Sequence, residues 1–486
     1  LSEGSPDSPF GHYALGKRHL LSEVLEVLDQ AARDPRIKAL VVRAGDSGMG
    51  MAQTQEILNA VTKFRLSGRP AYLFAASMNG TVDCYLASAF GEVWLQPSGE
   101  MGLTGFAMEN PFLKGTLDSL GVEAVFSARR EYKSAPEMFT NTEMTGPSRE
   151  SLAALLASWS SQVVADIARS RKLSPERVRA LIDQAPLQAR QALAAGLVDH
   201  LGYYDELTSV IEAKFHGAKP VELSAYDAAI PDPPHSLPQV AVIHGLGTVL
   251  PGESRFSPLT ANASMGAETI LQAFEAAIKD DAIVAIIFRV DSPGGDYTAS
   301  DAIWHEVKGA REKGKPVVAS MGDLAASGGY FASMAANRII AAPGTITGSI
   351  GVFSGKFVLR DFWNKFGVRW GEVHVGANAP MWSSNSDFTP EQRVRFEAML
   401  DAIYADFTTK AAADRNLTPE QIDHAARGRV FTGADALQVG LVDALGDFGT
   451  AVEHAKKLAK IPAVDRVNLV SFPKPKGLGE ALADVS

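Results

Sequence analysis

The sequence predicts an α/β fold built from two tandem copies of one domain, each with parallel-sheet βα layers and a helical extension. The first observation is a set of landmarks that recur at a nearly constant distance along the chain. Arg43 and Arg289 are 246 residues apart, as are Pro97 and Pro343, and the sequence GLVD at 196–199 returns 244 residues later. A shift this steady over many landmarks indicates a duplicated domain.

The second observation is the kind of strand that each copy contains. Ile283–Val290 reads IVAIIFRV and Ile37–Ala44 reads IKALVVRA. Continuous apolar runs rich in β-branched residues are typical of parallel strands buried on both faces. In the second copy we expect a helix next, then a strand over Pro316–Met321, a glycine-rich turn with a helix, and a strand over Arg338–Ala342. This alternation favours βα layers with right-handed crossovers.

The third observation is a long helical stretch near the end of each copy, over Ser148–Lys172 and Pro390–Arg415. The segments Leu173–Glu176 and Leu417–Glu420 then each place a Ser or Thr before a Pro. This pair is typical of a helix start, because the hydroxyl caps free amides and Pro fits the first helical position. We therefore expect another helix after each long one.

The domain boundaries follow from the repeat. The first copy is predicted over residues 1–213, a Pro-rich linker over 214–238, and the second copy over 239–486. The second copy opens with an expected strand over Gln239–Leu250, whose counterpart in the first copy would start before residue 1. We expect the first copy to lack that strand, and the chain, which begins with Leu1, to be trimmed of an upstream anchor.

Composition argues against several functions. The 486 residues carry 46 Lys plus Arg against 56 Asp plus Glu, a net charge of −10, which makes nucleic acid an unexpected partner. Cys84 is the only cysteine, so no intrachain disulfide or cysteine cluster can form. The ten histidines show no metal-ligand spacing, and neither a metal nor a cofactor is expected. No run of 18 apolar residues predicts a membrane-spanning helix.

The two copies differ where chemistry is expected. Ser327 lies between a predicted strand and a helix, and the first copy has Val82 in that place. Small neighbours expose a serine nucleophile, the Gly328 amide could stabilise an oxyanion, and Gly294 or Gly295 could supply a second amide. The alternative is a glycine-rich turn that only packs a helix on a sheet.

A serine nucleophile also needs a base. Residues 328–373 contain no histidine, so a Ser-His-Asp triad lacks support. Lys133 is present only in the first copy, where the second has Ala379, and this complements Ser327. To act near neutral pH its pKa must fall by about three units, which burial can supply, assisted by Arg129 and Arg130. Thr345, Thr347 or Ser349 could hold the amine, and we favour Ser349; a solvated surface lysine is the alternative.

These motifs have a familiar order. DSPGG, AASGGY and TGSIG in the second copy, with YKSA in the first, resemble the signal peptide peptidase A family, also called protease IV, in its long two-copy form. The resemblance implies tandem Clp-protease/crotonase-like domains and a Ser–Lys dyad protease, with Ser327 as nucleophile and Lys133 as general base. It also implies that cleaved signal peptides and other short hydrophobic peptides are the substrates.

The resemblance further implies a homotetramer attached to the bacterial inner (plasma) membrane by an N-terminal anchor, with the catalytic part on the periplasmic, outer side. Two other classes of function stay open from the residues. A crotonase-like enzyme acting on acyl-CoA thioesters would share glycine-rich oxyanion amides but would not need Ser327. A non-catalytic peptide-binding scaffold would need neither Ser327 nor Lys133. A Clp-like processive protease is less favoured, because no feature for docking an ATPase is visible.

Overall fold

The computed structural model describes residues 3, 20–45, 48–231, 234, 236–257 and 262–472. The second copy is built on a sheet whose central strands are β8 (Gln239–Leu246), β12 (Ile283–Ser292) and β13 (Val317–Ala326). The other strands are β14 (Arg338–Ala341), β15 (Ile346–Gly348), β17 (Val430–Thr432), β18 (Ala444–Leu445) and β19 (Asn468–Phe472). All pairings are parallel except β15 with β17.

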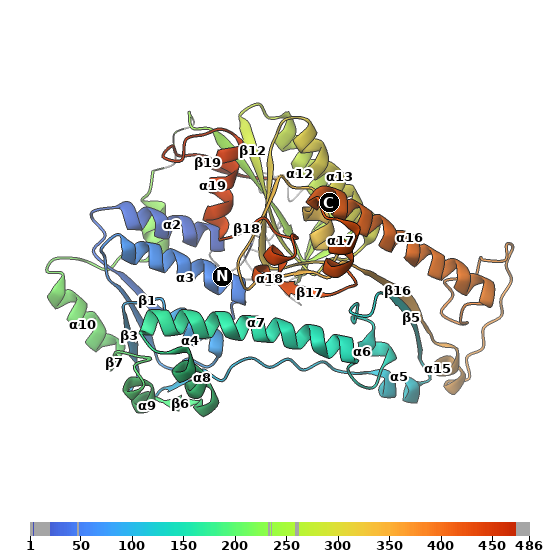
Figure 1. Cartoon of the computed structure of the whole chain (residues 1–486), viewed down its shortest axis with the longest axis horizontal. Coiled ribbons are helices and arrows are strands. Elements are labelled where there is room, and N and C mark those ends of the chain that lie inside the picture. The colour runs from blue at the N-terminus through green and yellow to red at the C-terminus, as the bar shows by residue number, and fades with distance from the viewer. Residues whose placement is uncertain are drawn as a thin grey trace.

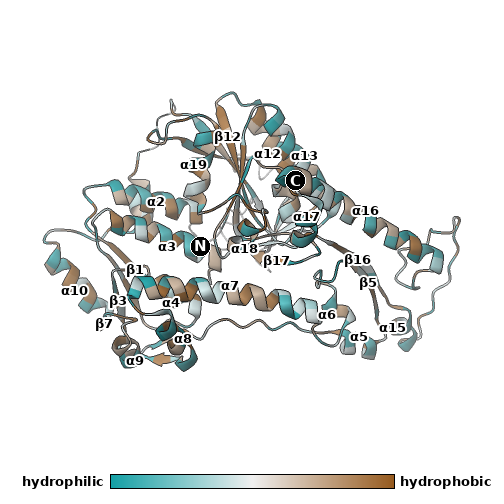
Figure 2. Ribbon diagram, viewed as in Figure 1, coloured by the Kyte–Doolittle hydropathy of each residue, from teal (hydrophilic) through white to brown (hydrophobic). Residues whose placement is uncertain are grey.

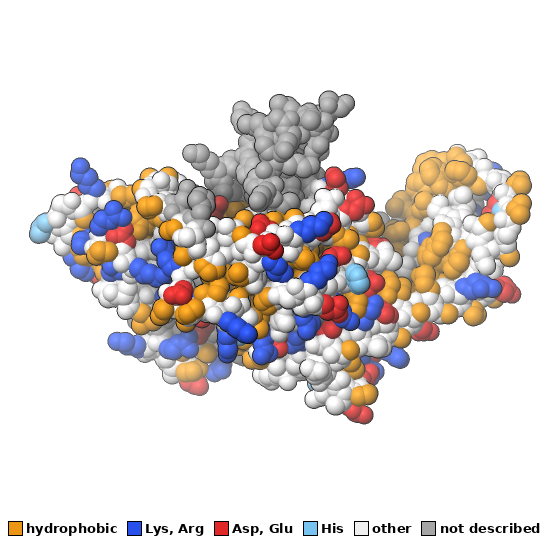
Figure 3. Space-filling view, turned by 90° about the horizontal axis from the view of Figure 1, so that it is seen from above, with side chains coloured by type: hydrophobic (Ala, Val, Ile, Leu, Met, Phe, Trp, Pro, Cys, Tyr) orange, Lys and Arg blue, Asp and Glu red, His pale blue; other side chains and the backbone are white. Residues whose placement is uncertain are grey.

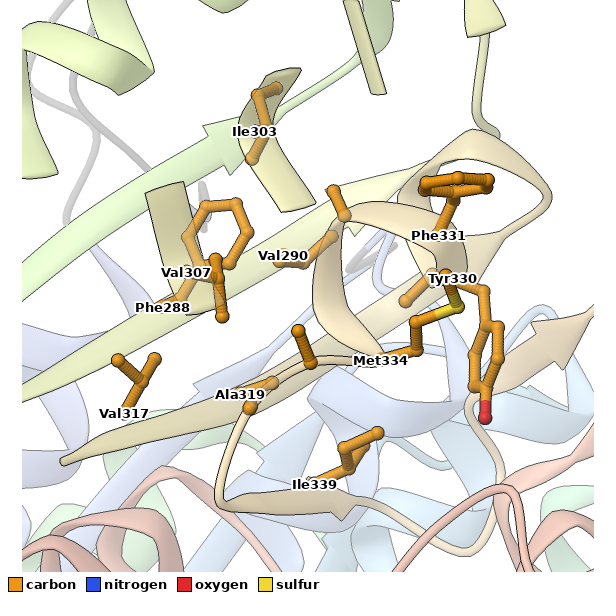
Figure 4. Close-up of a cluster of buried hydrophobic side chains, with 14 of the residues drawn as sticks. Phe288, Val290, Ile303, Val307, Val317, Ala319, Tyr330, Phe331, Met334 and Ile339 are labelled. Atoms are coloured by element: carbon orange, nitrogen blue, oxygen red, sulfur yellow. The ribbon is translucent and has the colours of Figure 1, made fainter. Parts of the chain in front are cut away.

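Helices cover both faces of this sheet (Figure 1). Helices α12 (Ala267–Lys279), α13 (Tyr297–Glu312) and α14 (Gly328–Ser333) pack on one face, and α19 (Phe448–Leu458) packs on the other. Figure 4 shows Phe288 and Val290 of β12 beside Val307 of α13 and Phe331 of α14 in the larger of the two cores. Burial on both faces explains why β12 reads as an unbroken apolar run, coloured brown in Figure 2.

The first copy contains a smaller parallel sheet in the order β1-β2-β3-β7. These strands are β1 (Leu40–Ala44), β2 (Ala71–Ala75), β3 (Glu92–Leu95) and β7 (His200–Leu201). Helices α2 (Leu21–Arg33), α3 (Met51–Leu66) and α4 (Thr81–Ala87) share its core. The first copy also contains β4 (Glu100–Met101), β6 (Leu187–Gln188), α8 (Pro175–Gln184), α9 (Ala189–Ala194) and α10 (Tyr204–Lys214).

The two copies share a two-stranded ribbon. Strand β5 (Glu123–Arg129) of the first copy pairs antiparallel with β16 (Val352–Val358) of the second. With α5 (Lys114–Leu120), α6 (Glu137–Thr140) and α15 (Arg360–Lys365), this ribbon forms the arm at the right of Figure 1. Helix α16 (Pro390–Arg415) packs on the ribbon through an apolar cluster of Val125, Val358, Phe388, Phe396 and Leu400.

Helix α7 (Gly146–Arg171) crosses from the first copy toward the arm (Figure 1). Its Trp159 Nε1 donates to the Gly344 carbonyl over 2.8 Å, and Gln162 Nε2 donates to the Pro343 carbonyl over 3.1 Å, so it binds the second copy. Although the sequence has no unbroken apolar run of 18 residues, α7 is the one helix in the described part of the chain that has the length and composition to cross a membrane.

Helix α3 also joins the copies. Asp323 of β13 accepts hydrogen bonds from the amides of Ala52 and Gln53, over 2.7 and 3.2 Å, and so caps the first turn of α3. Further along α3, Glu56 lies 2.8 Å from the Arg289 guanidinium of β12, and both side chains are buried. These contacts place the first copy against the edge of the sheet at which β13 ends.

Several elements differ from the sequence prediction. The expected strand Gln239–Leu250 is divided into β8 and β9 (Thr248–Leu250) by Gly247, whose φ is +77° and where a Cβ would lie 1.9 Å from the Ala263 carbonyl oxygen. The strand predicted to end at Met321 continues to Ala326, because its second half pairs with β15. The small strands β10 (Arg255–Ser257) and β11 (Asn262–Gly266), next to β9, were not expected.

Both long helices and both following helices are confirmed, the latter being α8 and α17 (Pro419–Ala425). The predicted linker contains a helix, α11 (Leu223–Ala228), and the domain boundaries themselves stay a prediction. The expected absence of a first strand concerns residues before 20, which, apart from Glu3, lie outside the described residues. Helix α18 (Gly433–Gln438) follows β17 directly.

Candidate active site

Ser327 stands at the sharp turn between β13 and α14. Its backbone has φ +54° and ψ −118°, a conformation that residues other than Gly rarely adopt and that costs about 1–3 kcal/mol. Hydrogen bonds hold it there, since its amide donates to the Gly348 carbonyl and its carbonyl accepts from the Phe331 amide, both over 2.9 Å. A strained turn between a strand and a helix is typical of an exposed serine nucleophile.

The glycines after Ser327 allow close packing. A Cβ on Gly328 would lie 2.4 Å from Ser300 Oγ, and one on Gly329 would lie 2.8 Å from the Ser292 carbonyl oxygen. The turn thus rests directly on the end of β12 and on α13. The glycine-rich turn does pack a helix on a sheet, as the alternative interpretation predicted. It also carries the hydroxyl of Ser327.

Lys133 reaches Ser327 from the other copy within the same chain. It follows β5, and its Nζ lies 2.9 Å from Ser327 Oγ. The same amine donates to Ser349, with its carbonyl oxygen at 2.9 Å and its Oγ at 3.0 Å. The hydroxyls of Thr345 and Thr347 bond instead to the carbonyls of Gly322 and Ala325. Of the three hydroxyls considered from the sequence, Ser349 is therefore the one beside the amine.

Burial controls the electrostatics of this amine. Lys133 is only 6% exposed, and desolvation of its charged form lowers its pKa from 10.5 to about 7. The arginines expected from the sequence to assist, Arg129 and Arg130, are not the cause, because burial alone lowers this pKa. Arg129 is instead paired with Glu397 and Asp401 at 2.8 and 2.6 Å. In the arm, the rings of Phe126 and Phe139 pack on each other and on Phe357.

Two glycine amides border the hydroxyl. A Cβ on Gly328 would meet the Gly295 nitrogen at 3.0 Å, so these two residues are in direct contact. Among the described residues, neither the Gly295 nor the Gly328 amide makes a hydrogen bond. The Gly294 amide, in contrast, donates to Ser292 Oγ over 3.1 Å. Gly295 and Gly328 are therefore the better placed pair for an oxyanion, and Gly294 instead shapes the turn with its φ of +96°.

No histidine assists the hydroxyl in the described part of the chain. His374 is exposed and pairs with Glu372, and no hydrogen bond joins His305 to Ser327. The described part of the chain also contains no group of three or more His, Cys, Asp or Glu side chains that could hold a metal ion.

Sequence reasoning missed the turn Arg427–Arg429, which bonds to the backbone of Tyr132, next to Lys133, and to the backbone of Ser349 and Ile350. With the spacing of 244 residues that relates the GLVD sequences, Asp183–Ala185 of the first copy stands in its place. The comparison of copies that singled out Ser327 and Lys133 would have found this turn too.

Comparison with known proteins identifies the family of the chain. A family model described as Peptidase family S49 matches residues 63–216 and again 309–462, once in each copy. Protease 4 of Salmonella typhi is 33% identical over 455 residues, covering 91% of this chain and 72% of that protein. The chloroplastic serine protease SPPA of Arabidopsis thaliana is 30% identical, covering 94% of this chain and 68% of that protein.

A third relative, a putative signal peptide peptidase SppA of Enterococcus faecium, is 30% identical over 38% of this chain and 53% of its own length. The chain is thus a serine protease, which removes the acyl-CoA and scaffold alternatives. It belongs to Peptidase family S49, in a two-copy form. The predicted fold class is confirmed as well, since the family matches twice, one main sheet is parallel and the other is parallel except for the β15–β17 pair.

Proposed function

We propose that this protease degrades cleaved signal peptides and other short hydrophobic peptides at the membrane with Ser327 as nucleophile and Lys133 as general base. The observation that carries the proposal is the 2.9 Å separation of Lys133 Nζ and Ser327 Oγ at a buried amine. The substrate class is supported by the name of the Enterococcus faecium relative, a putative signal peptide peptidase.

In the proposed reaction, neutral Lys133 accepts the proton of Ser327 Oγ as this oxygen attacks a peptide carbonyl. The amides of Gly295 and Gly328 stabilise the oxyanion. The protonated lysine then donates its proton to the leaving amine, and the peptide bond breaks to give an acyl-serine. A water that loses its proton to Lys133 hydrolyses this ester, and the proton returns to Ser327. Ser349 keeps the amine pointed at the hydroxyl throughout.

The test uses Ser327→Ala and Lys133→Ala with a fluorescent signal-peptide substrate. Each variant is expected to lose at least about a thousandfold in kcat/KM, because removing either member of a nucleophile–base pair disables both. Ser354→Ala on β16 and Lys114→Ala on α5 are matched controls that keep activity. Circular dichroism establishes that the variants are folded, and a folded Lys133→Ala variant with full turnover would disprove the dyad.

We also propose that the protease works as a homotetramer on the outer side of the bacterial plasma membrane, attached through an anchor outside this chain. Support comes from the arm, where Figure 3 shows apolar side chains gathered on the lobe at the right. Exposed residues there include Phe366, Trp370, Val373, Val375 and Trp382, of which Val373 is fully exposed. Apolar area of this kind usually marks an interface.

Assembly is tested by light scattering of the purified chain. The double variant Trp370→Ser with Val373→Ser is expected to lower the molar mass from four chains toward one. Val464→Ser removes an equally exposed side chain elsewhere and serves as the control. A tetramer that persists in the double variant would mean that the arm is not the interface, and a monomeric parent chain would contradict the tetramer.

A further inference from the structure

We propose that the turn Arg427–Gly428–Arg429 is a positioning element that holds the Lys133 amine against Ser327 and keeps water away from it. The turn follows α17 in the second copy, whereas Lys133 belongs to the first. This inference rests on the proposed dyad and assigns to the turn a role in setting the charge state of its base.

The backbone of the turn bonds to two segments, the one that contains Lys133 and the one that contains Ser349. The Arg427 carbonyl accepts from the Tyr132 amide over 3.1 Å, next to Lys133. The Gly428 amide donates to the Ile350 carbonyl over 2.8 Å, and the Arg429 carbonyl accepts from the Ser349 amide over 2.7 Å. Three consecutive residues therefore fix the register between the base and the serine that holds it.

Gly428 lies directly on the backbone of Lys133. Its φ is +84°, and a Cβ there would lie 2.4 Å from the Lys133 nitrogen and 2.6 Å from its Cα and Cβ. On the other side, a Cβ on Gly351 would lie 3.2 Å from Lys133 Cδ. Backbone therefore encloses the lysine stem closely, and the burial that lowers its pKa depends on these two glycines staying in place.

The flanking arginines fasten the turn to the first copy. Arg429 pairs with Glu150 of α7 at 2.6 Å and stacks 4.0 Å from the ring centroid of Tyr132, whose hydroxyl also donates to Glu150. Arg427 pairs with Glu131 at 2.8 Å and with Asp423 at 3.0 Å. Arg429 of the turn therefore holds the ring of Tyr132, the residue before Lys133.

The other charged groups around the lysine are also partnered. Arg130 lies 5.4 Å from the ring centroid of Tyr404, Arg129 pairs with Glu397, and the Tyr404 hydroxyl accepts from the Arg427 amide over 3.2 Å. None of them is a cause of the lowered pKa of Lys133, which comes from burial. Loosening the turn therefore lets water reach the Lys133 amine, which raises its pKa.

The experiment is the pH dependence of kcat/KM for Arg429→Ala, Arg429→Lys and Gly428→Ala. The parent enzyme is expected to lose activity as pH falls through about 7, because the amine becomes protonated. In Arg429→Ala this fall in kcat/KM at low pH, the acid limb of the profile, is expected to move up by about one pH unit. At pH values below the limb kcat/KM is then roughly tenfold lower than in the parent, and at high pH the activity recovers. Arg429→Lys keeps a positive charge that can pair with Glu150 and is expected to move the acid limb less.

Gly428→Ala is expected to shift the limb further than Arg429→Ala, and if it does not fold, the Arg429 variants carry the test. Arg36→Ala, which removes an exposed ion pair with Asp34, serves as the control and leaves the limb in place. A limb that stays at the parent pH in the Arg429 variants, with or without a uniform loss of activity, would overturn the positioning role. Failure of the dyad itself is distinct, since Lys133→Ala would then remain active.

Discussion

At the scale of single residues, Lys133 is a basic group placed where water cannot stabilise its charge. Its folded-state pKa of about 7 lies below the 10.5 of an exposed lysine. Between these two pH values the unfolded chain holds a proton that the folded chain has released, so the free energy of unfolding rises with pH across that window. Below about pH 7 both states are protonated and the full cost of burying the charge remains.

Lys133→Met is expected to flatten this dependence. Methionine fills a similar volume without a charge, so the rise in unfolding free energy between about pH 7 and 10, at most roughly 5 kcal/mol in the parent, is lost. Urea unfolding at several pH values measures the slope. Lys114→Met, at an exposed lysine of α5, is the control, and parallel curves for the parent and Lys133→Met would contradict the lowered pKa.

Ser327, the proposed nucleophile, has a strained backbone. With φ at +54°, Ser327→Gly is expected to stabilise the fold by about 1 kcal/mol relative to Ser327→Ala, because Gly adopts this conformation without strain. Both variants lose the proposed nucleophile and are expected to be inactive, so the comparison separates stability from activity. Thermal unfolding of the two variants measures the difference. A lower melting temperature for the Gly variant would show that the turn is unstrained.

At the scale of elements, α3 depends on a cap that comes from the other copy. Asp323 accepts from two amides of its first turn, and Gly50 leaves room for this carboxylate, since a Cβ there would lie 2.3 Å from Asp323 Cγ. Asp323→Ala is expected to lower the free energy of unfolding by about 1–2 kcal/mol. Asp323→Asn keeps an acceptor oxygen and is expected to cost less. Urea unfolding compares them, and equal losses would rule out the cap.

Sequence patterns predicted the elements that are determined locally. The Ser or Thr before Pro at 174–175 and 418–419 predicted two helix starts, and the Ser174 and Thr418 side chains do accept from the amides of Arg177 and Gln421. The apolar run of Ile283–Val290 predicted a buried parallel strand for the same reason, because its periodicity is contained in the segment itself.

Contacts between distant segments were harder to predict. Nothing in β5 or β16 alone reveals that they pair across the two copies, because alternation specifies a face and not a partner. Lys133 and Ser327 were nevertheless matched across 194 residues, since each is missing from the other copy. The sequence could not decide between Gly294 and Gly295 as the proposed partner of Gly328 in binding an oxyanion. The two differ in the structure, because the Gly294 amide already donates to Ser292 Oγ.

At the scale of the whole molecule, the candidate active site exists only while both copies are joined. The β5–β16 ribbon brings the lysine of one copy to the serine of the other, and α7 and α3 fasten the remainder. Glu56 is the most buried of these links, at 1% exposure. It accepts from Arg289 over 2.8 Å and from the Phe448 amide, at the start of α19, over 3.2 Å. We therefore expect the copies to unfold together.

Glu56→Ala tests this cooperativity. Removing the carboxylate leaves part of the Arg289 charge without its partner in the interior, and a loss of about 3 kcal/mol or more is expected, with a smaller loss for the isosteric Glu56→Gln. Native-state hydrogen exchange measures the effect in β2 of the first copy and β13 of the second. Equal loss of protection in both strands is expected of a single cooperative unit. Loss confined to β2 would mean that the first copy opens alone, and proteolytic activity would then fall with the population in which Lys133 has left Ser327.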